Sequence, residues 1–400
     1  MQVEDGEVAT ADARAWARSG AMALTGHRDG APLYPHTRAA ALVDELAAPF
    51  GLDSGLLSER AAMTGWRRQG QVTLGGGGRL LRAADGWMAM SLPRREDFEL
   101  LPALIGLDAQ PVQAWPAVAA WVAGRPGAEA VAQARLLGLA AGVVGEEPVA
   151  APARCSPHEG RSVRDLEGCV VLDLSSLWAG PLCSHLLARA GARVIKVEST
   201  SRPDGARRGN ADFYDLLNAG KESVALDLSS SSATRHLLAL VERADVIVTS
   251  ARARALSRLG MDPDAVAAGQ VWVAITARGW GDDSVGFGDD VAAAAGLVAW
   301  DEGGEPCFAG DAIADPLCGV IAAAAVRRGA TGFMDVSLQH AATAAMSQGT
   351  ATALRATVAQ AEAGEWSLWG EAVAAPRPRR PRERARDLGR DTAAVLAEMG

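Results

Sequence analysis

The chain has 400 residues, of which 49% are hydrophobic, and it carries a formal net charge of −9 at pH 7. That apolar content is enough for two or three domains with buried cores, and it excludes wholesale disorder. The net negative charge argues against a general nucleic-acid-binding protein, which normally presents a basic surface.

Several other classes are disfavoured by sequence features. The stretch MQVEDGEVATADARAW is acidic where a secretory signal is basic, and no apolar run approaches the ~18 residues of a membrane span. The five cysteines lack CxxC spacing, so we expect reduced thiols in a cytoplasmic protein. The six histidines are scattered without ligand spacing, so no metal site is expected.

The first part of the chain is predicted to combine helices with a short sheet. Apolar residues spaced three and four apart predict helix over most of 10–60. In 71–93, strands are expected on both sides of the four glycines and again at WMAMSL. Helices are expected over 95–106 and 113–146, and the Pro-rich stretch 147–164 is the best linker candidate.

After this linker the pattern changes to alternating strands and helices. Five apolar, branched runs predict strands: 169–175, 193–198, 223–228, 245–250 and 271–281. Helices are predicted between them over 181–192 and 232–244. This alternation indicates an α/β fold with a doubly wound, mostly parallel sheet. Ligands of such sheets bind at the carboxyl ends of the strands.

The last part of the chain is predicted to be mainly helical before an extended tail. Helices are expected over 290–300, 316–329 and 336–361. The Pro/Arg-rich tail 376–390 is predicted to be extended, with a short helix closing the chain. Interleaved acidic residues and prolines favour a solvated linker over a phosphate- or RNA-binding tail.

The stretch CVVLDLSSLWAGPLCSHLLARAGARVIKVE resembles the opening of the class III CoA-transferase family. Two later segments, LLNAGKESVALDL and ADVIVTSARARALSRLGMD, resemble the elements that follow it in that family. The family includes formyl-CoA and carnitine CoA-transferases and alpha-methylacyl-CoA racemase (the CaiB/BaiF type). The resemblance implies a Rossmann-like, doubly wound sheet domain together with a smaller α+β domain.

The segment PCFAGDAIADPLCG resembles the part of the family that carries its catalytic aspartate. Gly310, Asp315 and Gly319 fit the spacing, which implies that Asp315 is the nucleophile. The resemblance also implies a second active-site carboxylate at Asp289, with Asp290 as the near alternative. The local sequence alone favours an ordinary N-cap for an Asp-Pro pair that opens a helix, and the family resemblance reverses this in favour of the nucleophile.

The resemblance also implies a coenzyme A site on the sheet domain. Its expected residues are Lys196, Arg258, Trp178, Ala179 and Lys221, with Arg207 less directly implied. The two lysines are the only ones in the chain, and both fall inside the family motifs. The alternative is that the basic residues are ordinary solvated charges. Trp178 either lines an acyl pocket or belongs to the core.

Compared with the family, the two halves of the chain stand in reversed order. Residues 1–150 resemble the family's C-terminal half, as a small α+β domain that is either a degenerate tandem copy or a permutation. A linker over 151–164, a catalytic Rossmann-like domain over 165–345 and a C-terminal helix and tail over 346–400 are expected to follow. Gly75, Gly76, Gly77 and Gly78 match a mobile lid in formyl-CoA transferase or form a slack hairpin turn.

These features predict an acyl-CoA:carboxylate CoA-transferase that works through a mixed anhydride and then an enzyme–CoA thioester. Its expected substrates are an acyl-CoA and a small carboxylic acid, and its expected assembly is a homodimer without nucleic acid, membrane or metal. The alternatives are an acyl-CoA racemase or lyase-like enzyme on the same fold, or an inactive CoA-binding protein. The racemase is disfavoured because no histidine lies between His236 and His340.

Overall fold

The largest sheet of the molecule has seven strands in the order β4-β12-β9-β8-β5-β6-β7. The computed structural model describes residues 2–106, 114–146, 155–156, 166–265, 267, 269–346, 358–360 and 365–399. The strands are β4 (Cys155–Ser156), β5 (Val170–Leu174), β6 (Arg193–Ser199), β7 (Glu222–Leu226), β8 (Val246–Thr249), β9 (Val271–Thr276) and β12 (Gly332–Ser337). Six of them run parallel, and β4 pairs antiparallel with β12 at the edge.

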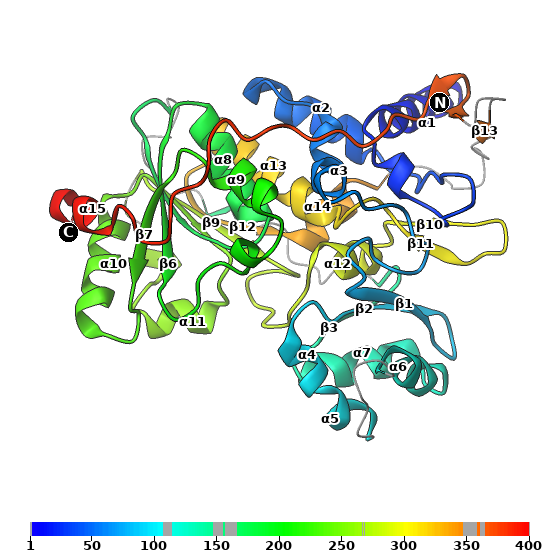
Figure 1. Cartoon of the computed structure of the whole chain (residues 1–400), viewed down its shortest axis with the longest axis horizontal. Helices are drawn as coiled ribbons and strands as arrows, with labels where there is room; N and C mark the ends of the chain where they lie inside the picture. Colours follow the sequence, from blue (N-terminus) through cyan, green and yellow to red (C-terminus); the bar gives the residue numbers. More distant parts are fainter. Residues whose placement is uncertain are drawn as a thin grey trace.

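Helices cover both faces of this sheet, as expected for a doubly wound α/β fold (Figure 1). One face carries α8 (Ala179–Arg189) and α13 (Ala314–Arg327), and the other carries α10 (Ser231–Arg243) and α15 (Thr392–Met399). Neighbouring residues of β5 enter the two different cores, and both are fully buried: Val171 on the α8 side and Leu172 on the α10 side. Burial on both faces explains why the strands are continuous apolar runs.

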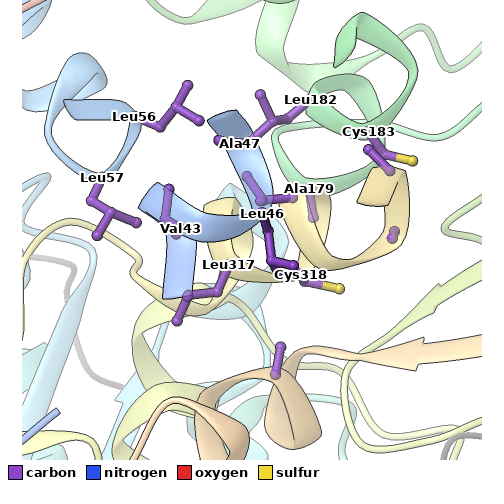
Figure 2. Packing of buried hydrophobic residues seen from close by; sticks show 14 of the residues in the cluster. Val43, Leu46, Ala47, Leu56, Leu57, Ala179, Leu182, Cys183, Leu317 and Cys318 are labelled. Atoms are coloured by element: carbon purple, nitrogen blue, oxygen red, sulfur yellow. The ribbon is translucent and has the colours of Figure 1, made fainter. Parts of the chain in front are cut away.

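The N-terminal helices pack against the α8 and α13 side of the large sheet. They are α1 (Gln2–Arg18), α2 (Ala39–Ala47) and α3 (Glu59–Thr64). Figure 2 shows Leu46 and Ala47 of α2 beside Leu182 of α8 and Leu317 of α13, all in one hydrophobic cluster. The packing therefore joins the first helices to the core of the large sheet rather than to the small sheet. The expected domain boundaries at 150 and 164 stay a prediction.

The small sheet consists of β1 (Gly78–Arg82), β2 (Trp87–Ser91) and β3 (Ala140–Val143), all antiparallel. One of its faces packs on four helices: α4 (Arg95–Glu99), α5 (Leu101–Ile105), α6 (Ala114–Ala123) and α7 (Gly127–Leu136). Its other face packs on α12 (Gly288–Ala294) and on the hairpin of β10 (Val298–Trp300) and β11 (Pro306–Phe308). The small sheet thus contacts the helix that carries Asp289.

The C-terminal segment crosses the molecule. Figure 1 shows it running from beside α1 across the top of the large sheet to α15. Arg379 pairs with Glu59 of α3 at 2.6 Å, and Asp391 accepts a hydrogen bond from the backbone N–H of Ser223 on β7 at 2.8 Å. No helix in the described part of the chain is long and apolar enough to cross a membrane.

The remaining elements are short. They are α9 (Ala211–Asn218), α11 (Ala253–Arg258), α14 (Leu338–Ala344), β13 (Val358–Gln360), β14 (Trp366–Leu368) and β15 (Glu371–Ala372). Five 3-10 turns complete the described chain: Met22–Leu24, Ala48–Phe50, Ser54–Leu57, Gly205–Arg208 and Pro263–Ala265.

All five strands predicted in the large sheet are confirmed, but several other predictions are wrong. Residues 71–74 form one isolated bridge rather than a strand, while β3 and β10 lie in segments predicted as helix. Both are short, alanine-containing strands that pairing with a neighbour stabilises against local propensity. The predicted helix 336–361 includes the end of β12 and the shorter α14. Most of the predicted linker 151–164 lies outside the described residues, and 155–156 form β4.

Candidate active site

Asp315 lies in the first turn of α13, but it does not cap that helix. The helix begins at Ala314, and its N-cap residue, Ile313, makes no side-chain capping bond. The interpretation of Asp315 as an ordinary cap is therefore wrong. The residue is half-buried and lies where the helix dipole favours an anion.

Helix α12 directs two neighbouring aspartates to different parts of the molecule. Asp290 is fully buried, accepts a backbone hydrogen bond at the start of the helix, and lies 3.8 Å from Nη2 of Arg278. Asp289 is half-buried, and its Oδ1 accepts a hydrogen bond from the backbone N–H of Ala312 at 2.9 Å. The structure thus joins Asp289 to the loop before α13 and gives Asp290 a structural contact.

The start of α12 and the loop before α13 approach each other very closely. A Cβ atom on Gly288 would lie 2.4 Å from the carbonyl oxygen of Ala312 and 2.6 Å from Oδ2 of Asp315. Ala312 itself has φ +43°, in the left-handed region that residues with a side chain rarely adopt. Backbone strain of this kind is concentrated at functional sites. Only glycine at 288 permits this approach of α12 to Ala312 and Asp315.

A cation from the N-terminal part of the chain faces these carboxylates. Arg60 of α3 donates to Asp311 twice, from Nε to Oδ2 at 3.0 Å and from Nη2 to Oδ1 at 2.5 Å. Its guanidinium carbon lies 4.4 Å from the ring centroid of Trp178 and 5.4 Å from that of Trp66. Sequence reasoning missed Arg60, because an arginine on a short helix far from the family motifs gives no signal of its own.

The site raises the pKa of both aspartates to about 7. For Asp315 the main cause is burial; the charge of Arg60 opposes the rise, and Asp290 and Asp311 add to it. For Asp289 burial again acts first, the charge of Asp311 adds to it, and Arg60 opposes it. Two carboxyls that titrate near neutrality in one cluster are typical of sites that use carboxylates chemically.

The structure does not place the two predicted coenzyme A lysines at an accessible surface. Lys196 and Lys221 are each 2% exposed, so the interpretation of either as a solvated charge is wrong. Nζ of Lys196 lies 3.0 Å from Oδ2 of Asp204, and Nζ of Lys221 lies 2.9 Å from Oδ2 of Asp173. The first pair joins β6 to the turn before Gly205–Arg208, and the second joins β5 to the loop between α9 and β7, which is a structural role. Phosphate binding by either lysine would require a conformation other than this one.

The other predicted coenzyme A residues differ in their exposure. Trp178 is 2% exposed and packs edge-on against Phe213 with ring centroids 5.0 Å apart, so it lies in the hydrophobic core, and its lining of an acyl pocket stays a prediction. Ala179 begins α8 and is also buried. Arg258 is exposed at the end of α11. Arg207 is bound to Glu198 at 2.5 Å. Of these residues, Arg258 is the one that offers an open cation.

The four glycines form a turn that leads into β1. Gly76 has φ +77°, and a Cβ on Gly78 would lie 2.6 Å from Cγ2 of Thr73, so the turn depends on glycine at two positions. Gly75 is exposed, and a Cβ there would lie 3.1 Å from the ring of Trp66. Because Trp66 also contacts Arg60, this glycine turn lies one side chain away from the carboxylate cluster. Its role as a lid stays a prediction.

Comparison with known families identifies one match. The model of CoA-transferase family III matches residues 166–372, just over half of the chain. The match includes Asp289, Asp311 and Asp315, whereas Arg60 and the small sheet lie outside it.

Individual relatives match shorter parts. A succinyl-CoA:mesaconate CoA-transferase of Haloarcula hispanica is 38% identical over 103 residues, 23% of this chain and 26% of the relative. A succinyl-CoA:glutarate CoA-transferase of Mus musculus is 31% identical over 228 residues, 51% of this chain and 52% of the relative. A crystal structure of a hypothetical protein from Mycobacterium tuberculosis is 28% identical, covering 46% of this chain and 57% of that one, with a TM-score of 0.41. The chain therefore spans about a quarter to a half of the curated relatives it matches.

Proposed function

This chain belongs to CoA-transferase family III, and we infer from that membership that it is an acyl-CoA:carboxylate CoA-transferase with Asp315 as its nucleophile. The observation that carries the proposal is the meeting of Asp289 and Asp315, brought from two helices into one half-buried cluster. Both side chains are partly exposed to solvent.

The reaction proceeds through two kinds of intermediate. The carboxylate of Asp315 attacks the thioester carbonyl of the donor, which forms a mixed anhydride and releases coenzyme A as a thiolate. The thiolate then attacks the aspartyl carbonyl carbon, which frees the donor acid and leaves a thioester on Asp315. The acceptor carboxylate attacks this thioester, which breaks the C–S bond, releases the coenzyme A thiolate again and forms a second anhydride. Coenzyme A attacks the acceptor's acyl carbon, giving the new acyl-CoA and restoring Asp315.

Asp289 assists from beside the nucleophile. With a pKa raised to about 7, part of the population carries a proton that it can donate to an oxygen as negative charge develops there. Its hydrogen bond to the backbone N–H of Ala312 fixes its position against the loop before α13. The coenzyme A moiety is expected at the carboxyl ends of the strands, and the exposed Arg258, on the helix that follows β8, is the cation proposed to bind it.

The names of the relatives favour small dicarboxylic acids as substrates to test first. The two relatives described above are named for succinyl-CoA with mesaconate or glutarate. We therefore propose an acyl-CoA donor and a small carboxylic acid acceptor, without a metal. We place the enzyme in the cytoplasm as a homodimer, and the four cysteines whose side chains the structure describes, all free and buried, are compatible with a reducing compartment.

A transfer assay tests this proposal. Purified protein is incubated with succinyl-CoA and each acid of a panel, and new CoA esters are separated by chromatography. Asp315→Ala should abolish transfer while coenzyme A binding, measured by calorimetry, is retained. Asp212→Ala, at an exposed aspartate on α9, is the matched control and should transfer at the wild-type rate. Unchanged transfer in Asp315→Ala would refute the nucleophile, and coenzyme A binding without any transfer would favour an inactive binding protein.

A further inference from the structure

The carboxylate cluster contains more negative charge than its own helices can balance. The charged and titratable groups around Asp315 are Arg60 on α3, Asp289 and Asp290 on α12, Asp311 in the preceding loop and Cys318 one turn along α13. Asp290 is paired with Arg278 at 3.8 Å, and Arg60 is the cation that faces Asp289, Asp311 and Asp315. Its own pKa reflects burial, which lowers it, and the charges of Asp311, Asp289 and Asp315, which together raise it above its ordinary value.

We propose that Arg60 is a positioning residue for the transfer reaction, a fixed cation whose charge favours the anionic, attacking form of Asp315 without binding its oxygens. The proposal rests on the proposed function, because it assigns Arg60 a task in the step that Asp315 performs. It also assigns a role at the site to the N-terminal part of the chain, which lies outside the family match.

The orientation of Arg60 is fixed by three side chains. Asp311 is 1% exposed and takes two hydrogen bonds from the guanidinium, which fixes the plane of the group. Trp178 and Trp66 add aromatic contacts at 4.4 and 5.4 Å. A guanidinium held in this way acts as a preorganised charge, since it need not reorient as the reaction proceeds.

The pairing with Asp311 explains how a cation can help a nucleophile without blocking it. A carboxylate clamped directly by both arms of an arginine has its lone pairs occupied and attacks poorly. Here Nε and Nη2 bond Asp311, so Arg60 acts on Asp315 through its charge. When Asp315 becomes acylated and loses its own charge, Asp311 still balances Arg60. The cation is therefore never left without a counter-charge during the cycle.

This inference predicts opposite shifts for two variants. Arg60→Met keeps the apolar stem but removes the charge, so Asp315 should titrate about one to three pH units higher than in the wild type. Asp311→Asn removes a negative charge and releases Arg60 to pair with Asp315 directly. Asp315 should then titrate lower than in the wild type, yet attack the thioester more slowly. A purely structural role for Arg60 predicts no such pair of opposite shifts.

The experiment is a carboxyl NMR titration of protein labelled with ¹³C-aspartate, with the Asp315 signal assigned by its loss in Asp315→Asn. Each variant is also mixed with succinyl-CoA, and the single-turnover rate of coenzyme A release is followed from pH 5 to 9. At pH 7 Arg60→Met should be about fivefold slower or more, because raising the pKa of Asp315 from about 7 to about 8 leaves roughly a tenth of these carboxyls ionised instead of roughly half. The rate should recover as the pH rises. Arg60→Lys should restore part of the rate, since lysine supplies the positive charge but not the planar, bidentate geometry of the guanidinium.

The outcomes separate the inference from the proposed function. An unchanged Asp315 titration in Arg60→Met, or a rate loss that higher pH does not recover, would overturn the role of Arg60. If the wild type releases no coenzyme A, the proposed transfer fails, while the NMR titration still decides whether Arg60 controls Asp315. Asp311→Asn provides the second arm if Arg60→Met does not fold, and an upward shift in that variant would also overturn the inference.

Discussion

At the scale of single residues, the candidate site is defined by two carboxyls whose pKa values are raised by their surroundings to near 7. Burial raises the pKa of Asp315 to about 7 although a cation lies nearby, and the same holds for Asp289. A nucleophile with such a pKa is ionised in about half of the molecules at neutral pH. Burying an ionised Asp315 costs free energy, and this cost lowers the stability of the fold.

This cost gives a prediction about stability and pH. Asp315 has a folded-state pKa of about 7 against an ordinary 3.8. Between these values the unfolded chain releases a proton that the folded chain keeps, so the wild type loses stability as the pH rises from 4 to 7. Asp315→Asn lacks this loss. In thermal melts, the Tm of Asp315→Asn should rise relative to the Tm of the wild type as the pH increases from 4 to 7. A Tm difference that stays constant over this range would contradict the raised pKa.

Gly288 is predicted to be indispensable for activity. Alanine there would place its Cβ 2.4 Å from the carbonyl oxygen of Ala312, so the loop before α13 must move. A displacement of about 1 Å at a reacting group costs on the order of 100-fold in rate. Gly288→Ala should therefore lose most of its transfer activity. Gly86→Ala is the control, because a Cβ at Gly86 meets nothing within 4 Å. Equal rates for the two variants would argue against this close approach.

At the scale of elements, a buried network ties β5 to α8. Nζ of Lys221 contacts Oδ2 of Asp173, Oγ of Ser184 at 2.8 Å and Oδ1 of Asn218 at 3.0 Å. Burial lowers the pKa of Lys221 to about 8, although Asp173 opposes this shift. The lysine in the family-like motif thus stabilises the turn from strand to helix that positions Trp178.

We expect Lys221→Met to destabilise the fold severely. It leaves Asp173 buried with one of its cations gone, which typically costs about 3–5 kcal/mol in the free energy of unfolding. Urea unfolding measures this loss, and the double variant Lys221→Met/Asp173→Leu should recover part of it. Weakened coenzyme A binding in Lys221→Met without loss of stability would favour the predicted ligand role instead.

Helices and strands could be predicted where the local sequence has a clear hydrophobic pattern, and not where it has none. Strands such as 170–174 and 246–249 were predictable because burial on both faces leaves an unbroken apolar run. The short strands β3 and β10 were not, because their small residues fit a helix equally well and pairing alone decides between the two. The exposed fractions of Lys196 and Lys221 were unpredictable for a related reason, since their partners come from other elements.

At the scale of the whole molecule, the site joins parts of the chain that are far apart in sequence. Asp289 and Asp315 could be predicted from family-like spacing, whereas Arg60 comes from a helix more than 200 residues earlier and becomes visible only through packing. Helices α1 and α2 share one hydrophobic core with α8 and α13, and the C-terminal segment spans from α1 to α15 (Figure 1). We propose that this arrangement completes one site within one chain.

The central claim is that Asp315 forms a covalent intermediate, and intact-protein mass spectrometry after mixing with acyl-CoA donors tests it most directly. The account predicts an adduct of acyl or coenzyme A mass that hydroxylamine removes, that maps to the peptide containing Asp315, and that Asp315→Ala lacks. An adduct on another residue, or multiple turnover without any adduct when the reaction is quenched on the millisecond scale, would contradict it.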